Sequence, residues 1–282
     1  MYKAICDVCF RHCSIPEGET GFCGGRICKG NKIIAGNYGR ITSLALDPIE
    51  KKPLARFHPG SLILSVGSYG CNLRCPFCQN HSISWSEEAM RFATTAEYIS
   101  PEKLAEIADG CRNRGNIGVA FTYNEPLIGY EYVRDTAKLI HDLGMKNVMV
   151  TNGTAEQAVL DELLPWIDAM NIDLKGFSEH YYSSLLGGNL DQVLSFIKKA
   201  AVGCHVELTT LIIPGENDSV DEMRELTDWI AALPGGESIP LHISRFFPTF
   251  HMTDRGATDV SLIYCLAETA QEKLRYVYTG NC

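Results

Sequence analysis

Three cysteines are spaced to hold three corners of an iron–sulfur cluster. Cys71, Cys75 and Cys78 follow one another as C-x3-C-x2-C in one loop, with Phe77 directly before the last of them. Three thiolates bind three irons of a cubane, and no fourth cysteine lies near enough in sequence to bind the fourth iron. That open iron can chelate S-adenosylmethionine (SAM) and place its sulfonium where one electron cleaves it. The alternative is a zinc ion on the same thiols with a distant ligand such as His81.

A second group of cysteines lies nearer the N-terminus. Cys6, Cys9, Cys13 and Cys23 form C-x2-C-x3-C-x9-C in a glycine-rich segment. Four thiolates close a tetrahedral site without a free position, so we expect this site to stabilise a segment with too few apolar residues to fold alone. Zinc and an auxiliary iron–sulfur cluster both accept four thiolates, and the sequence leaves both open, with thiols that bind no metal as a third alternative.

The elements that must position these residues follow an α/β pattern. From Ser61 onward, short β-branched runs alternate with longer amphipathic segments, which is typical of βα units. We expect strands at 62–66, 117–122, 147–151, 169–174, 205–213 and 239–244, and helices near 101–113, 130–143, 155–164, 189–201, 219–232 and 258–273. Six such units curl into a partial (β/α)6 TIM-like barrel. A short last strand is expected at 276–278.

Residues 1–60 differ in composition from the rest of the chain. They are rich in glycine, cysteine and charged residues and lack helical periodicity. We therefore predict a small, loop-rich, Cys-rich N-terminal appendage at 1–60 and a barrel domain at 61–282. Cys111, Cys204, Cys265 and Cys282 are isolated in sequence and are expected to be buried as small apolar residues.

Polar residues stand where the predicted strands end, which is where barrel active sites are built. Asp173 and Lys175 alternate with Leu174, so both side chains would point into the barrel, where ionised groups need partners. Each candidate also has a purely structural interpretation. Glu125 could be an exposed loop acid, and Thr151 could belong to an ordinary Asn-Gly turn. Asp173 and Lys175 could form a structural ion pair, and His242 could be a core histidine. The candidate residues are Asn124, Glu125, Thr151, Asp173, Lys175 and His242.

Several runs together resemble the radical SAM superfamily. The chain looks most similar to the branch that contains the glycyl-radical-enzyme activases, such as pyruvate formate-lyase-activating enzymes, and within it to the radical SAM member of the AmmeMemoRadiSam system. The runs that carry this resemblance are 47–54, 70–80, 123–126, 171–175, 212–219 and 276–281, and the family pattern includes the four N-terminal cysteines but not Cys28.

The resemblance implies a function and a set of site residues. A [4Fe–4S] cluster on the C-x3-C-x2-C motif would cleave SAM to a 5′-deoxyadenosyl radical, which takes a hydrogen atom from an unidentified substrate. Glu125 would accept a hydrogen bond from the SAM amino group, Lys175 would lie near its carboxylate, and His242 near its ribose. The residues implied around SAM are Phe77, Asn124, Glu125, Thr151, Asp173, Lys175 and His242.

Two departures limit what the resemblance implies. Val150 stands where activases commonly carry an aspartate that helps to bind a monovalent cation beside SAM. Thr209 stands where some activases carry an arginine, with Glu207 two residues earlier on the same strand face. The cation site is therefore left open, and activation of a glycine on a partner protein is an alternative function rather than the main prediction.

The composition of the chain limits which partners and which cell compartment are expected. The chain has 282 residues, a formal net charge of −9 and a pI near 5.4, so nucleic acid and anionic membranes would be repelled. No apolar run approaches the roughly 18–20 residues of a membrane span, and the N-terminus lacks a signal-peptide core, so we expect a cytoplasmic protein.

The resemblance implies a flavodoxin- or ferredoxin-like electron donor and association with Memo- and AMMECR-type proteins. The substrate would be a small molecule or a residue of a partner protein, and a metal-binding scaffold without turnover is the other alternative.

Overall fold

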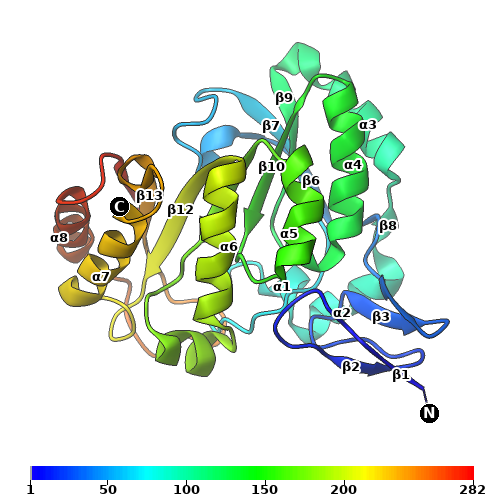
Figure 1. Cartoon of the computed structure of the whole chain (residues 1–282), viewed down its shortest axis with the longest axis horizontal. Coiled ribbons are helices and arrows are strands. Elements are labelled where there is room, and N and C mark those ends of the chain that lie inside the picture. The colour runs from blue at the N-terminus through cyan, green and yellow to red at the C-terminus, as the bar shows by residue number, and fades with distance from the viewer. Residues whose placement is uncertain (1) are drawn as a thin grey trace.

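The computed structural model describes residues 2–282, whose main element is one eight-stranded sheet (Figure 1). The strand order is β14-β13-β12-β11-β10-β9-β7-β6, with all neighbours parallel except β6 and β7. The strands are β6 Ser43–Pro48, β7 Leu62–Gly67, β9 Asn116–Phe121, β10 Lys146–Thr151, β11 Ala169–Asp173, β12 His205–Ile212, β13 Leu241–Arg245 and β14 Val277–Gly280. This is the partial barrel that the sequence predicts, including the short last strand.

Six helices connect successive parallel strands and pack on the outer face of the sheet (Figure 1). Polar side chains begin several of them at their N-caps: Ser100 accepts from the Lys103 N–H, and Ser219 accepts from the Glu222 N–H. The helices are α3 Pro101–Gly110, α4 Tyr130–Asp142, α5 Gln157–Leu163, α6 Leu190–Gly203, α7 Val220–Ala231 and α8 Val260–Gln271. All six βα units predicted from the sequence are present. Within residues 2–282, no helix is both long and apolar enough to cross a membrane.

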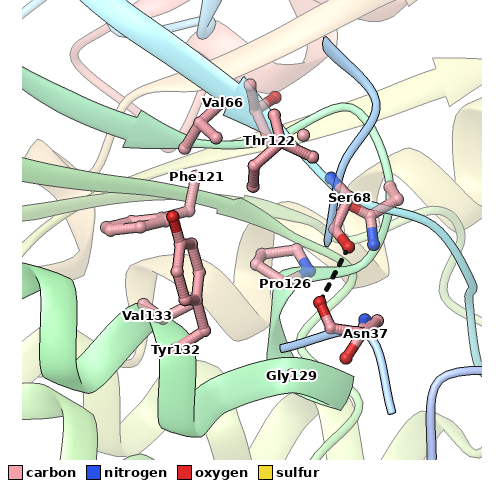
Figure 2. A pocket seen from close by; sticks show the side chains of 12 residues that line it. Asn37, Val66, Ser68, Phe121, Thr122, Pro126, Gly129, Tyr132 and Val133 are labelled. Atoms are coloured by element: carbon pink, nitrogen blue, oxygen red, sulfur yellow. Dashed lines mark hydrogen bonds between the residues drawn. The ribbon is translucent and has the colours of Figure 1, made fainter. Parts of the chain in front are cut away.

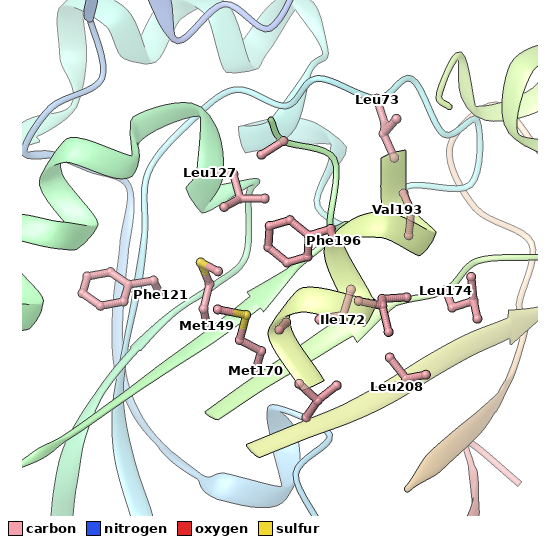
Figure 3. Packing of buried hydrophobic residues seen from close by; sticks show 14 of the residues in the cluster. Leu73, Phe121, Leu127, Met149, Met170, Ile172, Leu174, Val193, Phe196 and Leu208 are labelled. Atoms are coloured by element: carbon pink, nitrogen blue, oxygen red, sulfur yellow. The ribbon is translucent and has the colours of Figure 1, made fainter. Parts of the chain in front are cut away.

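Alternation along the strands divides the apolar residues into two groups. Met149, Met170 and Leu208 face the helices and pack with residues such as Phe196 of α6 (Figure 3). The neighbouring residues face the barrel interior, where they meet two side chains from the segment that precedes β7. This inner group is Ile63, Ala120, Val148 and Ala169 from the strands, with Ile49 and Leu54.

The N-terminal sixty residues contain short strands that the sequence did not predict. Two antiparallel pairs, β1 Lys3–Ile5 with β2 Ser14–Pro16 and β3 Arg26–Lys29 with β4 Lys32–Ala35, form this region, while β5 Arg40–Ile41 pairs with β8 Glu97–Tyr98. Strands this short carry too few residues to show a period of two. Because β6 pairs with β7, the main sheet begins before residue 60. The division of domains at residue 60 stays a prediction.

Two further elements and two cysteines differ from expectation. Helices α1 His81–Ser84 and α2 Glu87–Thr95 lie between β7 and α3, where we predicted no structure. Cys265 and Cys282 are exposed, so their predicted burial is wrong. Cys265 lies on the solvent side of α8, and Cys282 is the last residue of the chain.

Candidate cluster and cofactor site

One cavity of about 680 Å³ gathers the residues that end the parallel strands. This volume is within the range of pockets that enclose a small-molecule cofactor. The cavity brings together every residue predicted for the cluster and for SAM: Cys71, Cys75, Phe77, Cys78, Asn124, Glu125, Thr151, Asp173, Lys175 and His242. Their roles stay predictions, but the fold places them in one site.

Asn124 positions the cysteine loop, which leaves the sheet after β7. Its side-chain oxygen accepts from the Ser68 N–H at 2.9 Å, and its amide nitrogen donates to the carbonyls of Tyr69 and Gly70 at 3.1 and 3.2 Å. Arg74 donates to the Cys71 carbonyl at 2.8 Å. These bonds hold the backbone on both sides of the first thiol of the motif.

The three thiols suit a cluster better than a single ion. Across residues 2–282, no three thiol, imidazole or carboxylate groups lie close enough together to hold one metal ion, and in a cubane each thiolate binds a different iron. His81, the ligand of the zinc alternative, stacks on Phe250 with ring centroids 4.1 Å apart. Burial raises the pKa of all three thiols, that of Cys75 to about 12. Cluster assembly must therefore release protons from this loop.

Glu125 is buried, so the alternative of an exposed loop acid is wrong. Only 3% of the residue is exposed. Its Oε1 accepts from the Thr151 hydroxyl at 2.7 Å and the Leu127 N–H at 3.0 Å, and its Oε2 accepts from the Asn152 N–H at 2.8 Å. A carboxylate has about four acceptor positions, so one remains for a ligand in the cavity. Burial raises the pKa of Glu125 to about 7, although these hydrogen bonds oppose the shift.

We expect Glu125→Gln to change how stability depends on pH in the metal-free protein. Glu125 titrates near 4.5 when unfolded and near 7 when folded. Between these values the folded state binds more protons, so the free energy of unfolding falls as pH rises, by about 3 kcal/mol in all from this group. Urea unfolding at pH 5 and pH 8 should show a smaller fall for Glu125→Gln than for wild type, whereas the exposed control Glu106→Gln should match wild type. Equal falls in all three proteins would contradict the shifted pKa.

Asp173 and Lys175 form an ion pair in the cavity wall. The Lys175 Nζ donates to Asp173 Oδ2 at 2.7 Å, and both side chains are partly buried. Burial alone would lower the pKa of Lys175, but the neighbouring Asp173 and Cys75 outweigh it and raise the pKa above its usual value. The ammonium group is therefore charged at neutral pH and faces the same cavity as the three thiols.

His242 lines the cavity and is hydrogen-bonded to a buried carboxylate in the barrel interior. Its Nε2 lies 2.6 Å from Oε2 of the fully buried Glu207, whose Oε1 lies 2.9 Å from Nε2 of His205. Glu207 also accepts from the Ala55 and Arg56 N–H groups at 2.9 and 2.7 Å. Burial would raise the pKa of Glu207, but these hydrogen bonds lower it to about 2. His242 is thus a paired histidine with a face open to the cavity.

One part of the cavity wall was not predicted from the sequence. Glu50, Lys51 and Pro53 line it, because the segment before β7 passes across the barrel and is held there by Glu207. The run 47–54 could have indicated this part of the wall, because it carries part of the family resemblance. It was instead predicted to belong to the N-terminal appendage. At the other edge of the sheet, Thr279 and Gly280 at the end of β14 and Asn281 directly after it also line the cavity.

A smaller cavity of about 30 Å³ lies between the sheet and α4 (Figure 2). Phe121, Tyr132 and Val133 form its apolar side, and Ser68 bonds to the Asn37 carbonyl at its edge at 3.4 Å. This volume holds about one or two waters at most. It therefore offers no second cofactor site.

Comparison with known proteins shows to which family the chain belongs. Residues 65–230 match the family model of the Radical SAM superfamily, which is more than half of the chain. The chain belongs to the radical SAM superfamily. Members of this family are enzymes that use a [4Fe–4S] cluster and SAM, and the cysteine loop described above lies inside the matched region.

Individual relatives agree with this assignment. An uncharacterized protein of Methanocaldococcus jannaschii is 40% identical over 99% of this chain and 81% of its own length. The pyruvate formate-lyase 1-activating enzyme of Escherichia coli is 26% identical over 61% of this chain and 70% of its own. The predicted likeness to the activases is thereby confirmed, whereas membership of the AmmeMemoRadiSam system stays a prediction.

A solved structure supports the fold. SuiB of Streptococcus suis, in a structure bound to SAM, has a TM-score of 0.58 and 17% identity over 76% of this chain. The radical SAM chain described here covers 48% of SuiB, so it spans about half the length of that protein. At this identity the likeness concerns the partial barrel alone.

Proposed function

We propose that this radical SAM protein binds a [4Fe–4S] cluster through Cys71, Cys75 and Cys78 and cleaves SAM reductively. When bound, the cluster supplies one electron that converts SAM to methionine and a 5′-deoxyadenosyl radical, which removes a hydrogen atom from a substrate. The observation that carries the proposal is the single cavity that joins the three thiols to Glu125, Lys175 and the other predicted SAM residues.

Different residues around the cavity bind different groups of SAM. The Lys175 ammonium, positioned by Asp173, binds the carboxylate of SAM, because a charge-assisted hydrogen bond is strong in a partly buried site. Glu125, oriented by Thr151 and Asn152, accepts from the amino group through its remaining acceptor position. His242, held by Glu207, contacts the ribose from the other side.

The proposed reaction needs an electron from outside the chain. We propose a flavodoxin- or ferredoxin-like donor, because each cleavage consumes one electron. None of the twelve cysteines, all within the described residues 2–282, forms a disulfide. This fits a reducing cytoplasm, where we propose that such a donor is found. Memo- and AMMECR-type proteins are the partners that the predicted family membership favours.

The substrate has two candidate classes. Similarity to the E. coli activating enzyme favours a glycine of a partner protein. The cavity wall favours an unidentified small molecule, since Val150 and Thr209 replace charged residues of activases. The Thr209 hydroxyl instead donates to Asn171 Oδ1 at 3.0 Å. We favour the small molecule and keep glycyl-radical activation as the alternative.

The test is production of 5′-deoxyadenosine by the anaerobically reconstituted protein. With iron, sulfide, SAM and dithionite, we expect equimolar methionine and 5′-deoxyadenosine. A protein that carries its iron and binds SAM but yields neither product would support the non-catalytic scaffold instead.

A further inference from the structure

The four N-terminal cysteines line one small cavity. Cys6, Cys9 and Cys23 are buried, and Cys13 is partly exposed. Arg11, Arg26 and Asn72 line the same space. The four cysteines thus share one cavity wall, and whether they bind a metal stays a prediction.

This cysteine group touches the loop of the first cluster. The Cys71 N–H donates to the Cys23 carbonyl at 3.1 Å. Gly70, with φ +92°, allows this approach, since a Cβ there would lie 2.6 Å from the same carbonyl oxygen. The backbone of one ligand from each set is therefore hydrogen-bonded directly to the other.

A side-chain bridge runs parallel to the backbone contact. Asn72 is fully buried in the wall of the N-terminal cavity, and its Oδ1 accepts from Asn152 Nδ2 at 2.9 Å. The same Asn152 nitrogen lies 3.8 Å from Cys71 Sγ. Arg11 donates to the Asn72 carbonyl at 2.9 Å. Two amide side chains thus connect the two thiol sets.

The N-terminal segment also packs on the barrel through apolar and polar contacts that involve no metal ligand. Val8, Ile15 and Ile41 are buried and belong to the same apolar cluster as the barrel helices. An ion pair from Arg26 to Glu131 of α4, at 2.7 Å, and a bond from the Glu156 N–H to the Val8 carbonyl, at 2.8 Å, dock it on the barrel. These contacts weaken the expectation that the segment needs a purely structural metal to fold.

We propose that Cys6, Cys9, Cys13 and Cys23 hold a second iron–sulfur cluster, which passes electrons to the cluster at Cys71, Cys75 and Cys78. The proposal rests on the proposed function of the first cluster. Zinc has no redox chemistry, so a zinc ion in this site could not pass electrons across the contact between the two sites. The four thiols, like the three of the SAM site, do not converge on one ion within residues 2–282.

The electron balance of this relay is simple. A flavodoxin- or ferredoxin-class donor gives one electron to the second cluster, which returns to its oxidised form when it reduces the first. The first cluster then delivers the electron to the SAM sulfonium, whose bond to C5′ breaks. No proton or heavy atom is transferred at the second cluster. The guanidinium groups of Arg11 and Arg74 lie between the two loops and offset the negative charge of both.

Metal analysis tests the second cluster without relying on activity. In Cys71→Ala/Cys75→Ala/Cys78→Ala, anaerobic reconstitution should leave about four irons per chain, no zinc, and an electron paramagnetic resonance signal after dithionite reduction. About one zinc and no iron, or no metal in a folded protein, would overturn the proposal. If this variant does not fold, Cys9→Ser/Cys13→Ser should lower the iron of wild type by about half. Iron unchanged there overturns the proposal equally.

The relay has its own readout. With flavodoxin hydroquinone as donor, reduction of the remaining cluster in Cys9→Ser/Cys13→Ser should lose most of its wild-type rate, as followed by its resonance signal. Dithionite, a small reductant that needs no docking site, should reduce that cluster as it does in wild type. Equal rates with flavodoxin would overturn the relay. Failure of wild type to form 5′-deoxyadenosine would contradict the proposed function but leave the iron counts unaffected.

Discussion

Replacing Cys75 with alanine should remove the iron of the SAM site and all SAM-dependent formation of 5′-deoxyadenosine. Cys75 is 8% exposed and lines the cavity together with the other two thiols of the motif. Two thiolates hold a cubane much less securely than three, and no other ligand in sequence is spaced to replace the third. The measurements are iron per chain, the brown absorbance of the reconstituted protein, and product by chromatography.

Cys204→Ala is the matched control for Cys75→Ala. Cys204 is also partly buried in the barrel, and its thiol contacts only the Ala200 carbonyl at 3.6 Å among the hydrogen-bond partners within residues 2–282. This variant should keep the iron and activity of wild type. Because both variants lose one barrel thiol, a shared loss of activity would point to folding rather than to ligation. Product formation at the wild-type level in Cys75→Ala would contradict the assignment of the cluster.

The barrel was predictable because its strands are short, apolar and followed by polar residues. Strand residues such as Val148 and Met149 are buried on both faces, so strands such as β7 and β10 contain short apolar runs that are visible in the sequence. Asp173 and Lys175 stand where the fourth predicted strand ends, and the carboxyl ends of parallel strands meet at one edge of the barrel. The position of the site therefore followed from local sequence alone.

The contacts that complete the site were not predictable in this way. Glu207 binds the Ala55 N–H across 152 residues, and Asn152 binds Asn72 across 80. Such pairs leave no periodic signal, because each partner is a single polar residue in an otherwise ordinary segment. The strands of the N-terminal region were missed for a related reason: β1 and β2 have three residues each and are defined by their pairing.

Lys175→Met should weaken SAM binding by roughly 10- to 100-fold while leaving the iron content near that of wild type. The Lys175 ammonium is the partner that we propose for the SAM carboxylate, and a hydrogen bond to a charged group contributes about 1.5–3 kcal/mol. Methionine preserves most of the length and apolar bulk of the side chain but removes the charge. Equilibrium dialysis with labelled SAM, alongside iron analysis, measures both quantities.

Loss of Lys175 also leaves Asp173 without its ion-pair partner, and its carboxylate would then repel that of SAM. The double variant Lys175→Met/Asp173→Asn removes this repulsion, so its SAM affinity should recover in part but stay below that of wild type, because the cation is still absent. The exposed pair Lys103–Glu106, 2.9 Å apart on α3, provides the control, and Lys103→Met should bind SAM as wild type does. Full recovery in the double variant would mean that Lys175 only neutralises Asp173. Unchanged affinity in Lys175→Met would remove the ion pair from the SAM site altogether.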